Sequence, residues 1–151
     1  MKEWIYGKNP VYEVLRSGRR YSFRLWVAQG VKKNQRLNEI MGLARQKKVD
    51  VQQVPRQKLD EIHRNNQGVV LEASGYSYSD LVSILEKAVE SGEPPFVLLL
   101  DALQDPQNLG TLLRAAEIIG VHGVIIPRKN AAQVNPTVVS ASSGASEHLL
   151  V

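Results

Sequence analysis

The residues best suited to chemistry lie in one stretch, "DPQNLGTLLRAAEIIG", at 105–120. It places an acid, a proline, an amide and a glycine at the start of an expected helix, and Arg114 among leucines and alanines. The apolar run "FVLLLD" at 96–101 precedes it and predicts a strand. In parallel α/β sheets, ligands bind at the carboxyl ends of strands, and helix amino termini and arginines both favour anions. The stretch therefore indicates a site for a phosphate or an oxyanion.

Helical spacing divides this segment into two faces. Gly110, Arg114 and Glu117 are spaced to share one face. Glycine inside a helix costs about 1 kcal/mol relative to alanine, so Gly110 indicates that a ligand or another backbone approaches closely there. The other face is expected to be the core stripe, formed by Leu109, Leu112, Leu113, Ala116 and Ile119.

The same polar residues also allow a purely structural interpretation. Asp105 or Asn108 would cap the helix, and Pro106 would fill its first turn. Arg114 would then pair with Glu117 on the surface.

Composition excludes several classes of site. The 151 residues contain no cysteine, so disulfides and thiolate metal sites are absent. The three histidines lack ligand spacing, so we expect no metal site. No glycine-rich dinucleotide motif and no P-loop occurs, so the sequence does not support dinucleotide or NTP binding. The amino terminus lacks a secretory apolar region, and the longest apolar run, "FVLLL", is far shorter than the roughly 20 residues of a membrane span. We expect a soluble cytoplasmic protein without membrane contact.

Charge is divided unevenly along the chain. Residues 1–75 hold 15 Lys and Arg against 7 Asp and Glu, whereas residues 76–151 hold 4 against 8. The basic half is a candidate for binding nucleic acid, although a solvated lysine-rich surface is the simpler alternative. The predicted RNA contacts are two clusters: Arg19, Arg20 and Arg24 in "RSGRRYSFR", and Lys32 and Lys33.

Strands and helices alternate throughout, which predicts an α/β fold with a parallel sheet covered by helices on both faces. We expect a domain at 1–76, a linker region with a helix at 77–95, and a second domain at 96–151. Helices are predicted at 9–18, 34–48, 56–64, 79–95, 107–119 and 135–145. Strands are predicted at 23–29, 49–54, 69–76, 96–101, 123–127 and 148–151.

A family resemblance rests on ordered motifs. The pattern Asn108-x-Gly110-x-x-x-Arg114, between an apolar strand and Ala-x-x-x-Gly-Val, resembles the first signature of the SpoU (TrmH-like) RNA ribose methyltransferases. The segment "SASSGASEHLLV" at 140–151 resembles that family's next stretch. "YGKNPVYEVLRSG" and "QGVV" resemble its small RNA-binding domain of ribosomal-protein type, and the RlmB-like branch is the most similar.

The resemblance implies a fold, a reaction and site residues. A small ribosomal-protein-like α/β domain would precede the first part of a SPOUT-type domain, which forms a trefoil knot. The reaction would transfer a methyl group from S-adenosylmethionine to a ribose 2′-hydroxyl, in a guanosine of 23S rRNA. Asn108 and Arg114 would be the catalytic residues. Gly110 would be a structural motif residue, and Glu147 a structural or dimer-facing one.

The family's cofactor loop and knot segment would lie beyond Val151. We therefore expect a truncated chain that lacks most of the S-adenosylmethionine site, and a homodimer when the protein is full length. The alternative function is a non-catalytic, ribosomal-protein-like RNA-binding module with a remnant methyltransferase domain.

Overall fold

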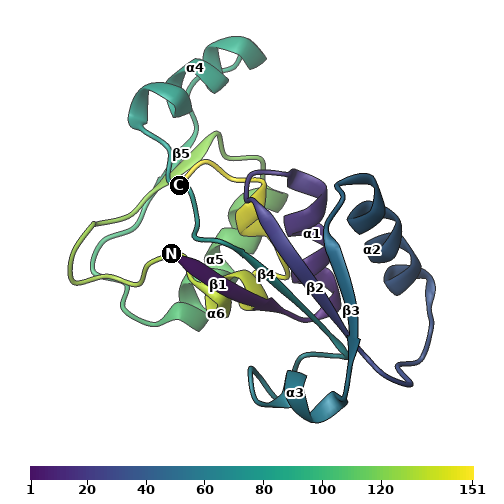
Figure 1. Cartoon of the computed structure of the whole chain (residues 1–151). Coiled ribbons are helices and arrows are strands. Elements are labelled where there is room, and N and C mark those ends of the chain that lie inside the picture. Colours follow the sequence, from purple (N-terminus) through teal and green to yellow (C-terminus); the bar gives the residue numbers. More distant parts are fainter. The chain divides into compact units, whose positions relative to one another are not determined.

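The computed structural model describes all residues from Met1 to Val151. The chain divides into two compact units, Met1–Gly75 and Tyr76–Val151. Each unit combines helices with a sheet, which agrees with the predicted α/β class. Figure 1 labels most of these elements.

Unit 1 contains a four-stranded sheet in the order β1-β4-β2-β3. Its strands are β1 (Lys2–Tyr6), β2 (Ser22–Ala28), β3 (Asp50–Val54) and β4 (Val69–Ser74), and its helices are α1 (Lys8–Ser17), α2 (Gln35–Gln46) and α3 (Arg56–Asp60). β4 pairs antiparallel with β1 and β2, and β2 pairs parallel with β3. The prediction of an all-parallel sheet is therefore wrong for unit 1.

Both faces of the unit 1 sheet carry apolar side chains. α1 and α2 pack against each other beside the sheet (Figure 1). The strands alternate, so Leu25 and Leu71 point to one face and Trp26 and Val70 to the other. This second face forms a cluster with Leu59 of α3, and its buried members are Tyr6, Trp26, Ala28, Val54, Leu59 and Val70.

Local signals explain where several helices begin and end. α2 starts after Asn34, whose side chain accepts a hydrogen bond from the Leu37 backbone N–H at 2.9 Å. α1 ends at Gly18, which adopts the left-handed conformation with φ of 68°. Its start differs from the prediction, because Gly7 rather than Asn9 occupies the cap position.

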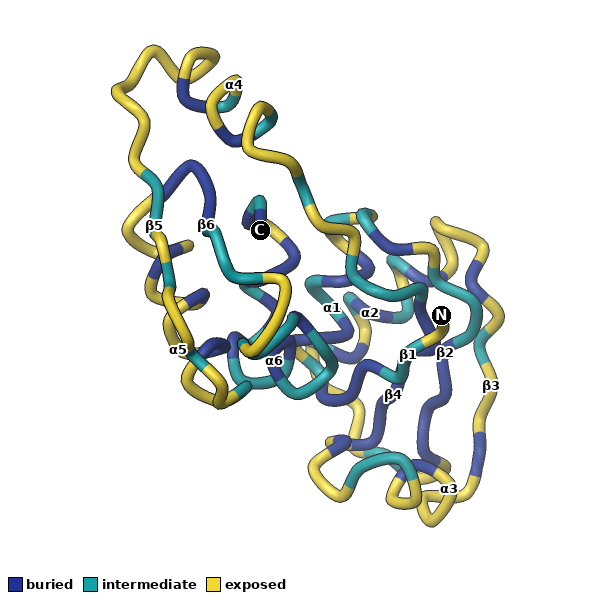
Figure 2. Tube along the Cα trace, turned by 90° about the vertical axis from the view of Figure 1, so that its left-hand side faces the viewer, coloured by how far each residue is buried: buried dark blue, intermediate teal, exposed yellow.

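Unit 2 is built around one strand–helix–strand unit. β5 (Val97–Leu99) leads into α5 (Pro106–Ile118), and β6 (Gly123–Ile125) returns parallel to β5. α6 (Pro136–Ala141) and a short 3-10 helix, η1 (Ala145–Glu147), pack against α5. α4 (Leu81–Ser91) is capped by Asp80, close to the predicted start at 79, and is mostly exposed, with Ile84 and Ala88 as its buried residues (Figure 2).

Residues 148–151 do not form the predicted strand. They make single backbone hydrogen bonds instead of a ladder. The Leu150 carbonyl accepts a hydrogen bond from the Val124 N–H at 2.8 Å, and the Val151 carbonyl accepts one from the Ser79 N–H at 2.8 Å. The parallel arrangement predicted for the second domain therefore holds for β5 and β6 alone.

Candidate functional site

The start of α5 is organised by Asp105. Its carboxylate accepts a hydrogen bond from the Gln107 backbone N–H at 2.9 Å, and Pro106 occupies the first turn. Asp105 thus serves as the cap that the structural interpretation predicted. Asn108, one turn on, is exposed and makes no side-chain hydrogen bond. Its amide is therefore available to a ligand.

Gly110 does not face a ligand. It is buried against α6, where a Cβ atom at this position would collide with the Ala141 side chain. The same atom would lie 2.9 Å from the Val138 carbonyl oxygen and 3.0 Å from the Ser142 nitrogen. Of the two close approaches that Gly110 indicates, by a ligand or by another backbone, the structure shows the second, because Gly110 makes room for the backbone of α6.

Arg114 is exposed and makes no hydrogen bond or ion pair with the rest of the chain. The surface pair with Glu117 that the structural interpretation predicted is absent. Asn108 and Arg114 are separated by about 9 Å along the helix and about 120° around it, so they occupy different faces. Asn108 therefore does not orient Arg114 by direct contact in this structure.

The stripe of α5 that packs into unit 2 differs from the predicted one. Leu109, Leu113 and Ala116 are buried as expected, and Gly110 joins them. Leu112 is 37% exposed and Ile119 is 61% exposed, so their predicted place in the core is wrong. The close contact at Gly110 rotates the buried face of the helix toward α6, away from these two residues.

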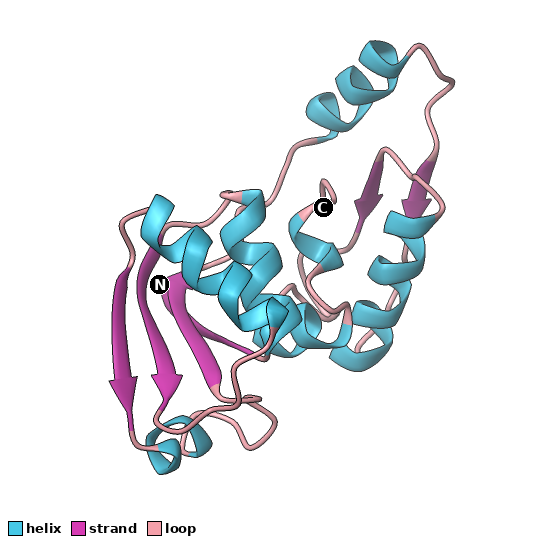
Figure 3. Cartoon of the chain, turned by 90° about the vertical axis from the view of Figure 1, so that its right-hand side faces the viewer, coloured by secondary structure: helices cyan, strands magenta, loops and turns pink.

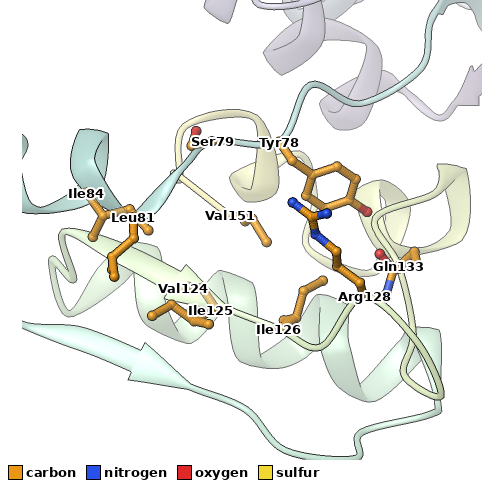
Figure 4. Close-up of a pocket in the computed structure, with 10 residues that line it drawn as sticks. All are labelled: Tyr78, Ser79, Leu81, Ile84, Val124, Ile125, Ile126, Arg128, Gln133 and Val151. Atoms are coloured by element: carbon orange, nitrogen blue, oxygen red, sulfur yellow. The ribbon is translucent and has the colours of Figure 1, made fainter.

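A cavity of about 470 Å³ lies beside β6 (Figure 4). Its wall is mostly apolar, and its polar residues are Tyr78, Ser79, Arg128 and Gln133. The Tyr78 hydroxyl accepts a hydrogen bond from the Val134 N–H at 2.9 Å, whereas the Arg128 side chain has no partner in the chain. Sequence reasoning missed Arg128, although its neighbour Lys129 marks a basic pair in the loop after β6.

This lining does not suit the whole of S-adenosylmethionine, the cofactor that the resemblance implies. The guanidinium of Arg128 would suit a carboxylate. No acidic side chain lines the cavity, so the sulfonium and ammonium groups of the cofactor would find no counter-charge. The residues of this chain therefore do not form a complete site for that molecule.

Glu147 lies in η1 with a fully buried side chain. Every buried side-chain nitrogen and oxygen in the chain has a hydrogen-bond partner. The burial of Glu147 agrees with the structural role among the two roles that the resemblance implied.

The predicted RNA contacts of unit 1 fall into different environments. Arg20 has a fully buried side chain that binds Glu3 at 2.7 Å and the Ser74 carbonyl oxygen at 3.2 Å. Arg24 binds Glu72 at 2.7 Å and keeps 41% of its side chain exposed. Because RNA cannot reach a buried guanidinium, we remove Arg20 from the predicted contacts.

Arg19 is half-buried, and Lys32 and Lys33 are exposed in the loop between β2 and α2. Neither lysine forms an ion pair. No group of three or more His, Cys, Asp or Glu side chains is placed to hold a metal ion. No helix has the length and hydropathy needed to cross a bilayer.

Comparison with known proteins matches both units to family models. Residues 4–79 match a family described as "RNA 2'-O ribose methyltransferase substrate binding". Residues 95–151 match the "SpoU rRNA Methylase family". α4 lies between the two matched regions.

Curated relatives align with almost the whole chain. A Bacillus subtilis protein, YacO, named for the TrmH family of tRNA/rRNA methyltransferases, is 40% identical over 150 residues, which cover 99% of this chain and 59% of YacO. A Staphylococcus aureus protein named for the same family is 39% identical over 148 residues, covering 97% of this chain and 59% of the relative. The chain thus spans about three fifths of these relatives' length.

Solved structures share the fold. The SpoU methyltransferase AviRb from Streptomyces viridochromogenes, in complex with AdoMet, has a TM-score of 0.73 at 22% identity and matches 98% of this chain and 52% of its own. An AdoMet-bound rRNA methyltransferase from Sinorhizobium meliloti has a TM-score of 0.72 at 22% identity, with the same coverage of both chains. The family model that matches residues 4–79, half of the sequence, shows that the chain belongs to the SpoU (TrmH-like) family of RNA methyltransferases, and the match of residues 95–151 to the SpoU rRNA methylase model agrees with it.

Proposed function

We propose that the protein containing this chain transfers a methyl group from S-adenosylmethionine to a ribose 2′-hydroxyl of RNA. Unit 1 would bind the RNA substrate, and unit 2 would contribute α5 and its polar start to the reaction site. The single observation that carries this proposal is Arg114, an exposed guanidinium without a protein partner in the motif of a SpoU-family chain.

Arg114 would act as a fixed positive charge. A guanidinium has a pKa above 12, so it does not accept a proton from the hydroxyl. It presents forked N–H donors, which suit a phosphate of the RNA or the negative charge that develops on the attacking oxygen. The cofactor would supply the electrophilic methyl group.

Asn108 would contact the ribose rather than Arg114. Its amide is exposed at the start of α5 and carries both a donor and an acceptor. A ribose hydroxyl needs both kinds of partner. Because Asn108 and Arg114 lie on different faces of α5, the two residues would contact separate groups of one nucleotide.

The proposed substrate is a guanosine of 23S rRNA, and the proposed full-length protein is a homodimer with a trefoil knot. The substrate proposal follows from the likeness to the RlmB-like branch and from neighbours that are named as rRNA methyltransferases. Curated relatives carry the broader description tRNA/rRNA, so tRNA is the substrate to compare. A ribosomal RNA substrate would place the reaction in the cytoplasm.

The test uses the full-length protein, S-adenosylmethionine with a labelled methyl group, and 23S rRNA or tRNA. We expect transfer to 23S rRNA and a large loss of kcat in Arg114→Ala. The matched control is Lys129→Ala, which removes one exposed charge from another part of unit 2. RNA binding without any label transfer would contradict the enzyme and favour the non-catalytic RNA-binding module.

A further inference from the structure

Unit 1 gathers several loops at one edge of its sheet. β1 and β2 are both antiparallel to β4, and β3 is parallel to β2, so β1, β2 and β3 run in the same direction. Their carboxyl ends lie together beside α3 (Figure 3). We call this edge the carboxyl edge, and it consists of residues 7–9, 29–34 and 55–68.

The carboxyl edge is rich in unpaired cations. Against the acids Asp60 and Glu61 it carries six basic residues: Lys8, Lys32, Lys33, Arg56, Lys58 and Arg64. Arg56 reaches Asp60 only at 4.0 Å, and Lys58 lies over the Trp26 ring at 4.2 Å. The side chains of the other four make no hydrogen bond or ion pair. These four cations come from three separate segments, the start of α1, the loop after β2 and the turn after α3, and remain available to an anion.

At the opposite edge of the sheet, several basic side chains are bound in ion pairs. Arg20 is bound to Glu3 at 2.7 Å, and Arg24 is bound to Glu72 at 2.7 Å. Lys2 also approaches Glu72, at 3.5 Å. Three of the cations that the sequence places there are thus neutralised within unit 1. Ion pairing thus reduces the charge that Lys2, Arg20 and Arg24 offer to an anion.

The turn that presents Arg64 is held rigidly. The buried Asn66 side chain donates to Asp60 Oδ1 at 2.6 Å and to the His63 carbonyl at 2.8 Å. Its own oxygen accepts a hydrogen bond from the Gly68 N–H at 2.8 Å. The His63 ring stacks on Tyr6 with centroids 3.7 Å apart and 8° between the planes.

A second contact joins this turn to the loop after β1. The Gln67 side chain accepts a hydrogen bond from the Lys8 backbone N–H at 2.9 Å. The backbones that carry Lys8 and Arg64 are therefore fixed relative to each other before any ligand arrives. Such preorganisation lowers the entropy lost on binding.

We infer that the carboxyl edge is the surface on which unit 1 binds the RNA phosphodiester backbone, through Lys8, Lys32, Lys33 and Arg64. The Arg19–Arg24 segment at the opposite edge is then chiefly structural. This inference rests on the proposed function, since it takes RNA as the substrate. It adds Lys8 and Arg64 to the predicted RNA contacts. It also gives different roles to the two basic clusters, both of which the sequence predicts as RNA contacts.

The test compares two triple variants of the full-length protein with equal loss of charge. The first is Lys32→Ala/Lys33→Ala/Arg64→Ala at the carboxyl edge. The control is Arg45→Ala/Lys47→Ala/Lys48→Asn, which removes three exposed cations near the end of α2. Asparagine is used at position 48 because Lys48 has a φ of 56°, a conformation that asparagine tolerates. Circular dichroism checks that both variants fold.

The probe is a fluorescein-labelled RNA hairpin with an unpaired loop, titrated by anisotropy at several salt concentrations. We expect the carboxyl-edge variant to bind about tenfold or more weakly at about 0.1 M salt, with the slope of log K against log salt reduced by about 2 to 3. The control should stay within about twofold of the parent. Equal losses in both variants, or a larger loss in the control, would overturn the inference. No binding by the parent chain would overturn both the inference and the proposed RNA substrate.

Discussion

Gly110 of α5 lies against Ala141 of α6 so closely that position 110 has no room for a side chain. We expect Gly110→Ala to lower the free energy of unfolding by about 1–3 kcal/mol, because overpacking outweighs the gain in helix propensity. Urea denaturation monitored by circular dichroism measures the change.

Gly42→Ala is the matched control, since Gly42 lies in α2 and has no atom within 4 Å of an added Cβ. It should raise stability by up to about 1 kcal/mol. Adding Ala141→Gly to Gly110→Ala should restore part of the loss, because the Val138 carbonyl would still lie 2.9 Å away. Equal stability of the two alanine variants would contradict this packing.

Substitution of Arg20 distinguishes a structural role of this residue from a role in RNA binding. Its side chain is fully buried, and its partner Glu3 is 16% exposed. Removing one partner of a buried pair leaves the other charge uncompensated, so Arg20→Ala should cost about 3–5 kcal/mol. Lys33→Ala, at an exposed position, should change stability by less than about 0.5 kcal/mol. An Arg20→Ala chain with parental stability but weakened RNA binding would show that Arg20 contacts RNA after all.

The environment of Arg20 illustrates a limit of prediction from sequence. The cluster "RSGRRYSFR" shows four arginines but not that one of them meets an acid from β1 and a carbonyl from β4. The sequence does not predict β1, because this short strand contains the charged residues Lys2 and Glu3. It forms only by pairing with β4, which comes at the end of the sequence of unit 1. Long-range pairing of this kind leaves no local signal.

Local sequence signals predicted helix starts more successfully than the sequence predicted long-range strand pairing. Asn34 and Asp80 cap α2 and α4 within one residue of the starts predicted at 34 and 79, because a side-chain acceptor near free backbone N–H groups needs no tertiary partner. The order of Asn108, Gly110 and Arg114 led to the family that the comparisons show. The role of Gly110 was not predictable in detail, since a glycine can make room equally for a ligand or for another helix.

The cap of α4 predicts a pH dependence. The pKa of Asp80 lies below its ordinary value of 3.8, first because the Ser83 hydroxyl donates to the carboxylate and then because the Ser83 backbone N–H does so. The stabilisation is therefore present above the ordinary pKa and is lost as pH falls through the lower folded value. Protection of the α4 amides against hydrogen exchange should fall over this acidic range.

Ser83→Ala tests the cause of that shift. It removes the hydroxyl but keeps the backbone donor, so the Asp80 pKa should rise toward 3.8 while the helix cap persists. NMR titration of the Asp80 carboxyl group measures the pKa in both chains. An unchanged pKa in Ser83→Ala would contradict the assignment to the hydroxyl.

The most direct measurement is of the methylated nucleoside. RNA treated with the full-length protein and S-adenosylmethionine is digested to nucleosides and separated by mass spectrometry. The proposed function predicts a 2′-O-methylated ribose, which Arg114→Ala strongly reduces without altering urea denaturation, since Arg114 is exposed and unpaired. A methyl group found only on a base, or full methylation by Arg114→Ala, would contradict the proposed role of this helix.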